Sequence, residues 1–210
     1  MATAEKLITV AENQEKVYNA GYEKGKAEGI NYDTFWDRYQ ANGGAISYYY
    51  AFAFNRFNAE TFKPKYAIVG NSSGSALQNV FYNSTTITEI NVDIDARNTN
   101  NIGALFYNCT GLKTVKKLFV DDTTTNGGGN AFYKCSALTS IEIDGTIVMN
   151  WNMDVCPLDK KSIESVYAAL STSVSGKTCT LKKTAVNAAF TDEEWKALTD
   201  AKDNWTFTLV

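Results

Sequence analysis

The chain has no histidine among its 210 residues. This absence removes Ser-His-Asp triads, HExxH zinc sites and the commonest general base of enzymes. Catalysis would have to use carboxylates, lysine, tyrosine or cysteine. The sequence therefore favours functions other than catalysis.

Cysteine is scarce, and its spacing is not that of a metal or redox site. The four cysteines, Cys109, Cys135, Cys156 and Cys179, form no C-x-x-C pair, so no zinc, redox or other cofactor site is predicted. Free cysteine is among the most readily buried residue types. We expect these side chains to be small core residues.

Two further absences limit the partners. The net charge is −3 and no basic stripe occurs, which excludes a nucleic-acid groove from our expectations. No apolar run approaches the roughly 20 residues that span a membrane, so no insertion is expected. Glu5 and Lys6 beside a short apolar run do not fit a signal peptide. We expect a protein that is made in a cytoplasm and kept reduced there.

What the chain does have is an internal repeat. Phe81-Tyr82-Asn83-Ser84 recurs as Phe106-Tyr107-Asn108-Cys109 and as Phe132-Tyr133-Lys134-Cys135, with spacings of 25 and 26 residues. A short apolar strand pattern follows each copy. Periods of about 20–50 residues are typical of solenoids, so residues 67–150 are predicted to form a short solenoid of about three to four rungs.

The strand of each repeat has two unlike faces. Alternation over residues 89–94 places isoleucine and valine on one face and polar side chains on the other. In the middle copy Val115 and Leu118 are three residues apart, which predicts a bulge at Lys116-Lys117. Those lysines should lie between acidic rungs, where each pair is worth roughly 0.2–1 kcal/mol.

Paired carboxylates on these strands are the one candidate for catalysis. Asp93 and Asp95 share a face, as do Glu142 and Asp144. Two carboxylates can hydrolyse a glycosidic bond. However, this spacing is what any polar strand face gives, so we predict a solvent-exposed face and no enzyme.

Residues 1–30 are predicted to lie outside the globular core, as a helical arm for attachment or oligomerisation. Leu7, Val10, Val17 and Gly21 follow helical spacing, and Gly25 continues a series of glycines four residues apart. Each glycine costs a helix roughly 1 kcal/mol relative to alanine. Two hypotheses remain open: a flexible charged arm, or a helix that becomes ordered against a partner through these five residues.

Residues 31–66 hold twelve of the 27 aromatic residues. The spacing within 32–39 predicts a short helix, and the rings are expected to cover the open end of the solenoid as an aromatic-rich cap. The run Tyr48-Tyr49-Tyr50 cannot point inward as a whole. It is the candidate for an exposed aromatic contact.

Residues 151–210 are predicted to close the other end as an α/β cap. Asp159 is placed to cap a helix, a strand follows Gly176, and Trp205 to Leu209 alternate as a last strand. Thr191 and Glu194 make a capping box, flanked by the apolar pair Phe190 and Trp195.

The repeats resemble those of a known family. "NAFYKCSALTSIEI" (130–143) and "ALFYNCTGLKTV" (104–115) are similar to BspA-type leucine-rich repeats, whose rung is roughly aromatic-x-x-Cys-x-x-Leu-x-x-Ile-x-Ile. The first copy departs from this pattern by Ser84 for Cys and Ile87 for Leu. The resemblance covers about residues 66–150. It implies an α+β fold with a leucine-rich-repeat solenoid that serves as an interaction scaffold.

The flanking segments narrow this expectation. "YDTFWDRYQ" (32–40) and "LDKKSIESVYAAL" (158–170) resemble parts of structural proteins in phages and prophages of Gram-positive gut bacteria. This implies a non-enzymatic virion component: a fibre, tail or capsid-decoration protein. Its partners would be other virion proteins, further copies of itself (a homotrimer is favoured) and a host surface protein or glycan. The alternatives are a bacterial leucine-rich-repeat protein-binding module and, third, a glycan-cleaving virion enzyme.

Overall fold

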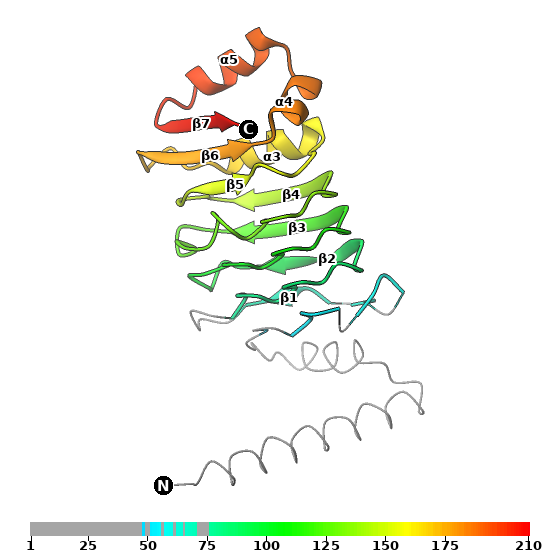
Figure 1. Ribbon diagram of the computed structural model, residues 1–210. Helices are drawn as coiled ribbons and strands as arrows, with labels where there is room; N and C mark the ends of the chain where they lie inside the picture. The colour runs from blue at the N-terminus through cyan, green and yellow to red at the C-terminus, as the bar shows by residue number, and fades with distance from the viewer. Residues whose placement is uncertain (1–47, 49–50, 56, 61, 65, 71–75) are drawn as a thin grey trace, which may run out of the picture.

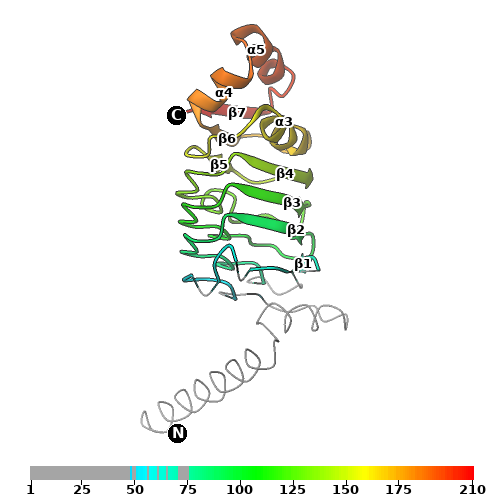
Figure 2. The same ribbon diagram turned by 90° about the vertical axis from the view of Figure 1, so that its right-hand side faces the viewer.

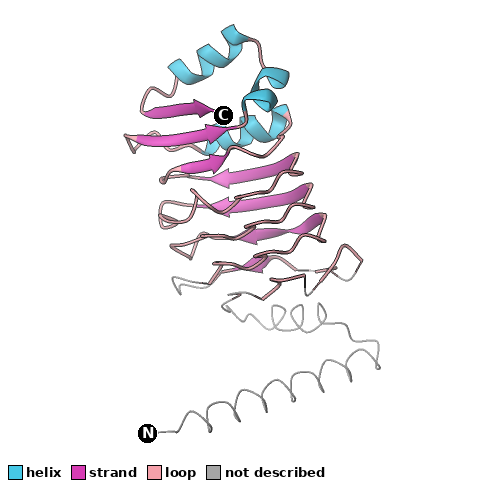
Figure 3. Cartoon of the chain, viewed as in Figure 1, coloured by secondary structure: helices cyan, strands magenta, loops and turns pink. Residues whose placement is uncertain are grey.

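The computed structural model describes residues 48, 51–55, 57–60, 62–64, 66–70 and 76–210. This part of the chain is mixed α/β, with two parallel sheets and three helices (Figures 1 and 3). The strands follow one another along a single axis, and the helices gather at the C-terminal end (Figure 2). The predicted arm over 1–30 and the predicted helix over 32–39 lie outside the described residues.

The first sheet is built from the repeats. Its order is β1 (Ile68–Val69), β2 (Glu89–Asp95), β3 (Thr114–Val120) and β4 (Ser140–Gly145), and every neighbouring pair is parallel. Ile90, Val115 and Ile141 lie in register across β2, β3 and β4, and all three are buried. The predicted alternation of apolar and polar faces is confirmed.

The predicted bulge is also present. The pairing of β3 with β4 shifts register between Val115 and Leu118, the segment that holds Lys116 and Lys117. The pairing of β2 with β3 shifts between Ile90 and Asp93. The extra residue lets Val115 and Leu118 both face the core although they are three residues apart.

A column of aromatic rings runs through the core beside the sheet. Phe81 and Phe106 stack with centroids 5.3 Å apart, and Phe106 and Phe132 follow at 5.5 Å. Phe52 extends the column below Phe81, and Trp151 closes it above Phe132 at 5.6 Å. Such pairs are worth about 0.5–1.5 kcal/mol each beyond the apolar area that they bury.

A second column links each turn of chain to the one before it. The Cys109 Sγ donates to the carbonyl oxygen of Phe81, and the Cys135 Sγ donates to that of Phe106, both at 3.0 Å. Ser84 Oγ makes the equivalent bond to the Phe52 carbonyl at 2.6 Å. The serine of the first copy therefore keeps the contact that cysteine makes in the other two.

The C-terminal region forms a second parallel sheet and the three helices. The sheet order is β5 (Trp151–Met153), β6 (Lys177–Leu181) and β7 (Trp205–Leu209). The helices are α3 (Lys160–Ala169), α4 (Lys183–Ala189) and α5 (Asp192–Asp200). The predicted helices at 160 and 192 and the strands at 178 and 205 are confirmed, whereas β5 and α4 were not predicted.

Two helix starts agree with the sequence. Asp159 Oδ1 accepts from the Ser162 backbone N–H at 2.8 Å, which begins α3. Thr191 and Glu194 form the reciprocal capping box of α5. The Phe190 and Trp195 rings lie 5.8 Å apart across that start, as the hydrophobic staple requires.

Helix α3 covers the outer edge of β4. Ser162 Oγ accepts from the Ile141 backbone N–H at 2.9 Å, and Ser165 Oγ accepts from that of Ile143 at 2.6 Å. Ser165 Oγ also donates to the Ile143 carbonyl oxygen. The first sheet therefore ends on an edge whose polar groups are satisfied by a helix, which prevents further strand pairing there.

Candidate functional site

A group of charged side chains surrounds Phe119 on the first sheet. Asp95, Phe119 and Asp144 lie in register across β2, β3 and β4 on the solvent-facing side. Arg97, Lys117 and Glu142 complete the group, which we call the Phe119 cluster. Strands β2, β3 and β4 each contribute residues to it, so the register between these strands sets its geometry.

One side of the cluster is a two-pronged ion pair. Arg97 donates through Nε to Asp95 Oδ1 at 2.9 Å and through Nη2 to Asp95 Oδ2 at 2.6 Å. Its guanidinium lies 4.7 Å from the centroid of the Phe119 ring. The Arg97 hydrogen bond lowers the pKa of the Asp95 carboxyl, so this carboxyl stays ionised.

The other side is organised by Lys117. Its Nζ lies 2.6 Å from Glu142 Oε1, 3.3 Å from Asp144 Oδ2 and 5.2 Å from the Phe119 centroid. The bond to Glu142 raises the pKa of Lys117. Lys116 pairs in the opposite direction, with Asp93 at 2.9 Å. The prediction that these lysines lie between acidic rungs is confirmed.

The carboxylates in and beside the cluster are paired with basic side chains. A glycosidic general acid needs a carboxyl whose pKa is raised, whereas the pKa of Asp95 is lowered. Asp93, Glu142 and Asp144 each have a lysine partner within 3.3 Å. The cluster presents fixed charges of both signs around a ring, which is the chemistry of a polar contact surface.

The cysteine thiols are core groups. All four are free and buried. Burial raises the pKa of Cys135 and of Cys179 to about 12, and it raises those of Cys109 and Cys156 as well. A thiol needs a lowered pKa to act as a nucleophile or a metal ligand. Within the described residues, no group of three or more acidic, cysteine or histidine side chains is arranged to hold a metal ion.

A ladder of tyrosines follows the repeat on the surface. Tyr82 and Tyr107 stack at 4.9 Å and Tyr107 and Tyr133 at 4.7 Å, with Phe54 in edge contact with Tyr82 at 5.6 Å. No role was predicted for these tyrosines, although their spacing of 25 and 26 residues is a usable signal. Tyr82 and Tyr107 are half-buried and Tyr133 is exposed. Because the rings stack on one another, the faces between them are not free for a sugar.

The predicted aromatic contact is wrong at Tyr48. Its side chain is 1% exposed, packs against Phe52 at 6.0 Å, and its backbone N–H donates to Ala76. Three consecutive tyrosines imply that at least one points outward, but they do not say which. Tyr49 and Tyr50 lie outside the described residues, as do the predicted attachment residues Leu7, Val10, Val17, Gly21 and Gly25.

Comparison with known proteins gives no relative. No family model, curated protein or solved structure matches the chain. Among the residues that the structure describes, no helix has the length and apolar character needed to traverse a lipid bilayer.

Proposed function

We propose that the chain is a short BspA-like leucine-rich-repeat solenoid that serves as a non-enzymatic structural component of a phage virion. The observation that supports this most strongly is that the same side-chain contacts recur in each copy of the repeat. Phe81, Phe106 and Phe132 stack in turn. Cys109 and Cys135 each donate to the backbone carbonyl of the phenylalanine in the preceding repeat. Each turn of chain therefore packs against its neighbour in the way that solenoid units do.

The Phe119 cluster is the surface that such a scaffold would present. Arg97 and Lys117 both lie close to the Phe119 ring, 4.7 Å and 5.2 Å from its centroid, while Asp95 and Glu142 pair with these two cations. Little side-chain entropy is then lost when a partner binds, which favours recognition by preorganisation. We propose that a partner protein or a host-surface glycan contacts this face.

Residues 1–30 are proposed to attach the protein to the particle and to other copies of itself. The contact residues would be Leu7, Val10, Val17, Gly21 and Gly25, with a homotrimer as the favoured assembly. This part of the proposal is supported by the helical spacing of the sequence and by the resemblance of the flanking segments to virion-structural proteins.

Two alternatives make different predictions. A bacterial leucine-rich-repeat binding module would be a monomer that does not associate with particles. A glycan-cleaving enzyme would lose hydrolysis of host-wall glycan on Asp93→Asn or Glu142→Gln. The ion pairs of Asp93 and Glu142 with lysines favour the non-enzymatic role.

The assembly part is tested by the mass of the protein in solution. Light scattering on a sizing column should give a trimer for the full chain and a folded monomer for a variant that lacks residues 1–30. Circular dichroism of the shortened variant controls for unfolding. A full chain that is monomeric at all concentrations would contradict self-assembly through residues 1–30 and favour the binding module.

A further inference from the structure

The turn after β3 contains an Asn-Gly pair, Asn126-Gly127. The backbone nitrogen that follows an asparagine is near enough along the chain to attack the carboxamide carbon of that side chain. Glycine hinders this attack least, because it has no side chain and its backbone rotates most freely. The one other such pair, Asn42-Gly43, lies outside the described residues.

The carboxamide of Asn126 is exposed and lightly held. Its Nδ2 donates to Thr125 Oγ1 at 3.1 Å, and this is the only hydrogen bond that the carboxamide makes within the described residues. No contact therefore keeps the side chain away from the nitrogen of Gly127. By contrast, Asn130, four residues on, has its Oδ1 engaged by the Ala104 backbone N–H at 3.2 Å.

The fold requires glycine at position 127. Its φ angle is +99°, and a side chain here would place its Cβ 2.2 Å from the backbone nitrogen of Gly103 in the neighbouring turn. Within the described residues, the Gly127 N–H donates no hydrogen bond. The close approach of the two turns therefore leaves an unshielded nitrogen directly after an asparagine.

The backbone of Asn126 is what restrains the reaction. Its N–H donates to Asn100 O at 2.9 Å, and its carbonyl oxygen accepts from the Ile102 N–H at 3.1 Å. Ring closure requires rotation about the bond between the Asn126 Cα and carbonyl carbon, which moves that carbonyl away from Ile102. The turn must therefore open locally before the Gly127 nitrogen reaches the side chain, and such opening costs less than global unfolding.

We propose that Asn126-Gly127 is a site of spontaneous deamidation, which proceeds when this turn opens. The Gly127 nitrogen loses its proton and bonds to the Asn126 Cγ, while the bond from Cγ to Nδ2 breaks and ammonia leaves. Water then opens the cyclic imide at one of its two carbonyl carbons. Attack at Cγ gives aspartate, and attack at the main-chain carbonyl carbon gives isoaspartate.

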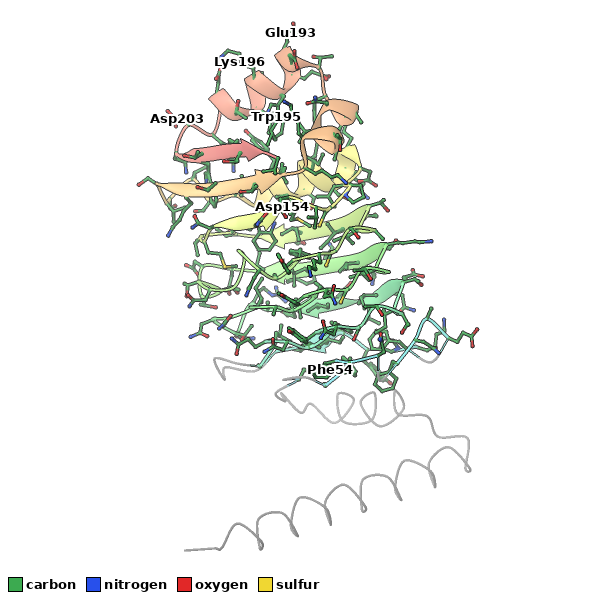
Figure 4. The ribbon with its side chains drawn as sticks, viewed as in Figure 1. Phe54, Asp154, Glu193, Trp195, Lys196 and Asp203 are labelled. Carbon is green, nitrogen blue, oxygen red and sulfur yellow. The ribbon has the colours of Figure 1, made fainter. Side chains whose placement is uncertain are left out.

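The same turn connects the repeats to the C-terminal sheet. Gly128 O accepts from the Asn152 N–H of β5 at 3.0 Å, and the Gly128 N–H donates to Met149 Sδ at 3.3 Å. Figure 4 shows Asp154, the residue after β5, at the level where the two sheets meet. Isoaspartate adds one carbon to the main chain immediately before this connection, so the bonds to Asn100 and Ile102 cannot both re-form. The isoaspartyl product therefore loosens the junction between the sheets.

The test follows the full chain during incubation at pH 6 and at pH 8, folded or unfolded in guanidinium. Trypsin releases residues 118–134 as one peptide, and mass spectrometry with electron-transfer fragmentation separates aspartate from isoaspartate at each position. We expect conversion at Asn126 and none at Asn130 in the same peptide. It should be several-fold faster at pH 8, because the attacking nitrogen must lose its proton, and several-fold faster in guanidinium, which removes the restraining bonds.

Three variants separate the chemistry from its consequence. Asn126→Gln should abolish the conversion, since glutamine would have to close a larger ring, whereas Asn98→Gln, at another exposed asparagine, should leave the rate unchanged. Asn126→Asp has the new charge on a normal main chain and should melt close to the parent protein. The isoaspartyl form, separated by ion exchange, should melt several degrees lower.

Three results would overturn the proposal. The first is a folded protein that stays intact at Asn126 while the unfolded chain converts. The second is an equal rate in the folded and the unfolded protein, which would mean that opening of the turn does not limit the reaction. The third is an isoaspartyl form that melts like the parent protein. None of these results bears on particle association, so this proposal and the proposed function can fail separately.

Discussion

Truncation of Leu138 to alanine tests the repeat packing most sharply. Leu138 is fully buried, and its counterparts in the neighbouring copies, Leu112 and Ile87, are each 1% exposed. Turns of chain lie on both sides of it, since Thr139 O accepts from Asp159 N and Thr139 N–H donates to Lys113 O. The site is thus clamped and cannot collapse freely around a cavity.

The expected cost is therefore in the upper part of the usual range for leucine-to-alanine changes, about 3–5 kcal/mol. For a chain of this size it corresponds to a fall in melting temperature of about 6–20 °C. Urea unfolding followed by circular dichroism measures the change in the free energy of unfolding. Ser136→Ala, at an exposed position two residues away, is the matched control and should cost less than about 0.5 kcal/mol. A cost near zero for Leu138→Ala would refute the packing described here.

Three further predictions follow from the contacts of the repeats. Ser84→Ala should cost about 0.5–1.5 kcal/mol because it removes the buried hydrogen bond from the Ser84 hydroxyl to the Phe52 carbonyl, whereas Ser84→Cys should be tolerated, since Cys109 makes the same bond; equal stability of the two variants in urea unfolding would contradict this. The four thiols of the folded protein should not react with a thiol-specific disulfide reagent at pH 8, and all four should react once the protein is unfolded in guanidinium. A thiol that reacts rapidly in the folded protein would be inconsistent with the burial of all four. The pKa of Asp95 is lowered in the folded state, so the contribution of this carboxylate to stability is complete above the ordinary value of 3.8 and is lost as the pH falls through the lowered pKa. The difference in unfolding free energy between the parent protein and Asp95→Asn should therefore shrink as the solution is acidified. A difference that stays constant with pH would argue against the ion pair with Arg97.

The parts of the fold that the sequence predicted are those with local or periodic signals. The bulge at Lys116-Lys117 and the capping box at Thr191 follow from residue types a few positions apart, and the repeat follows from a regular spacing of 25 and 26 residues. The elements that were missed have weak local signals. Strand β5 has three residues, and α4 has seven, with Lys182 at its N-cap giving no side-chain bond.

Only the strand residues of the Phe119 cluster could be predicted from the sequence, because only they follow a local pattern. The alternation of residues along the strands predicted the positions of the carboxylates and the lysines. Arg97, however, lies in the turn after β2, where there is no such alternation to indicate which way its side chain points. Its place over Phe119 depends on how β2 and β3 align, which a single sequence does not state. The burial of Tyr48 is likewise a tertiary outcome, since it depends on packing against Phe52.

The most direct test of the proposed function is the location of the protein. Particles released from the bacterium that carries the gene would be purified on a density gradient, and each fraction would be digested and analysed by mass spectrometry. Peptides of this chain should sediment with the major capsid and tail proteins and stay with them through a salt wash. Peptides found only in the soluble fractions, with intact particles free of them, would contradict a virion role.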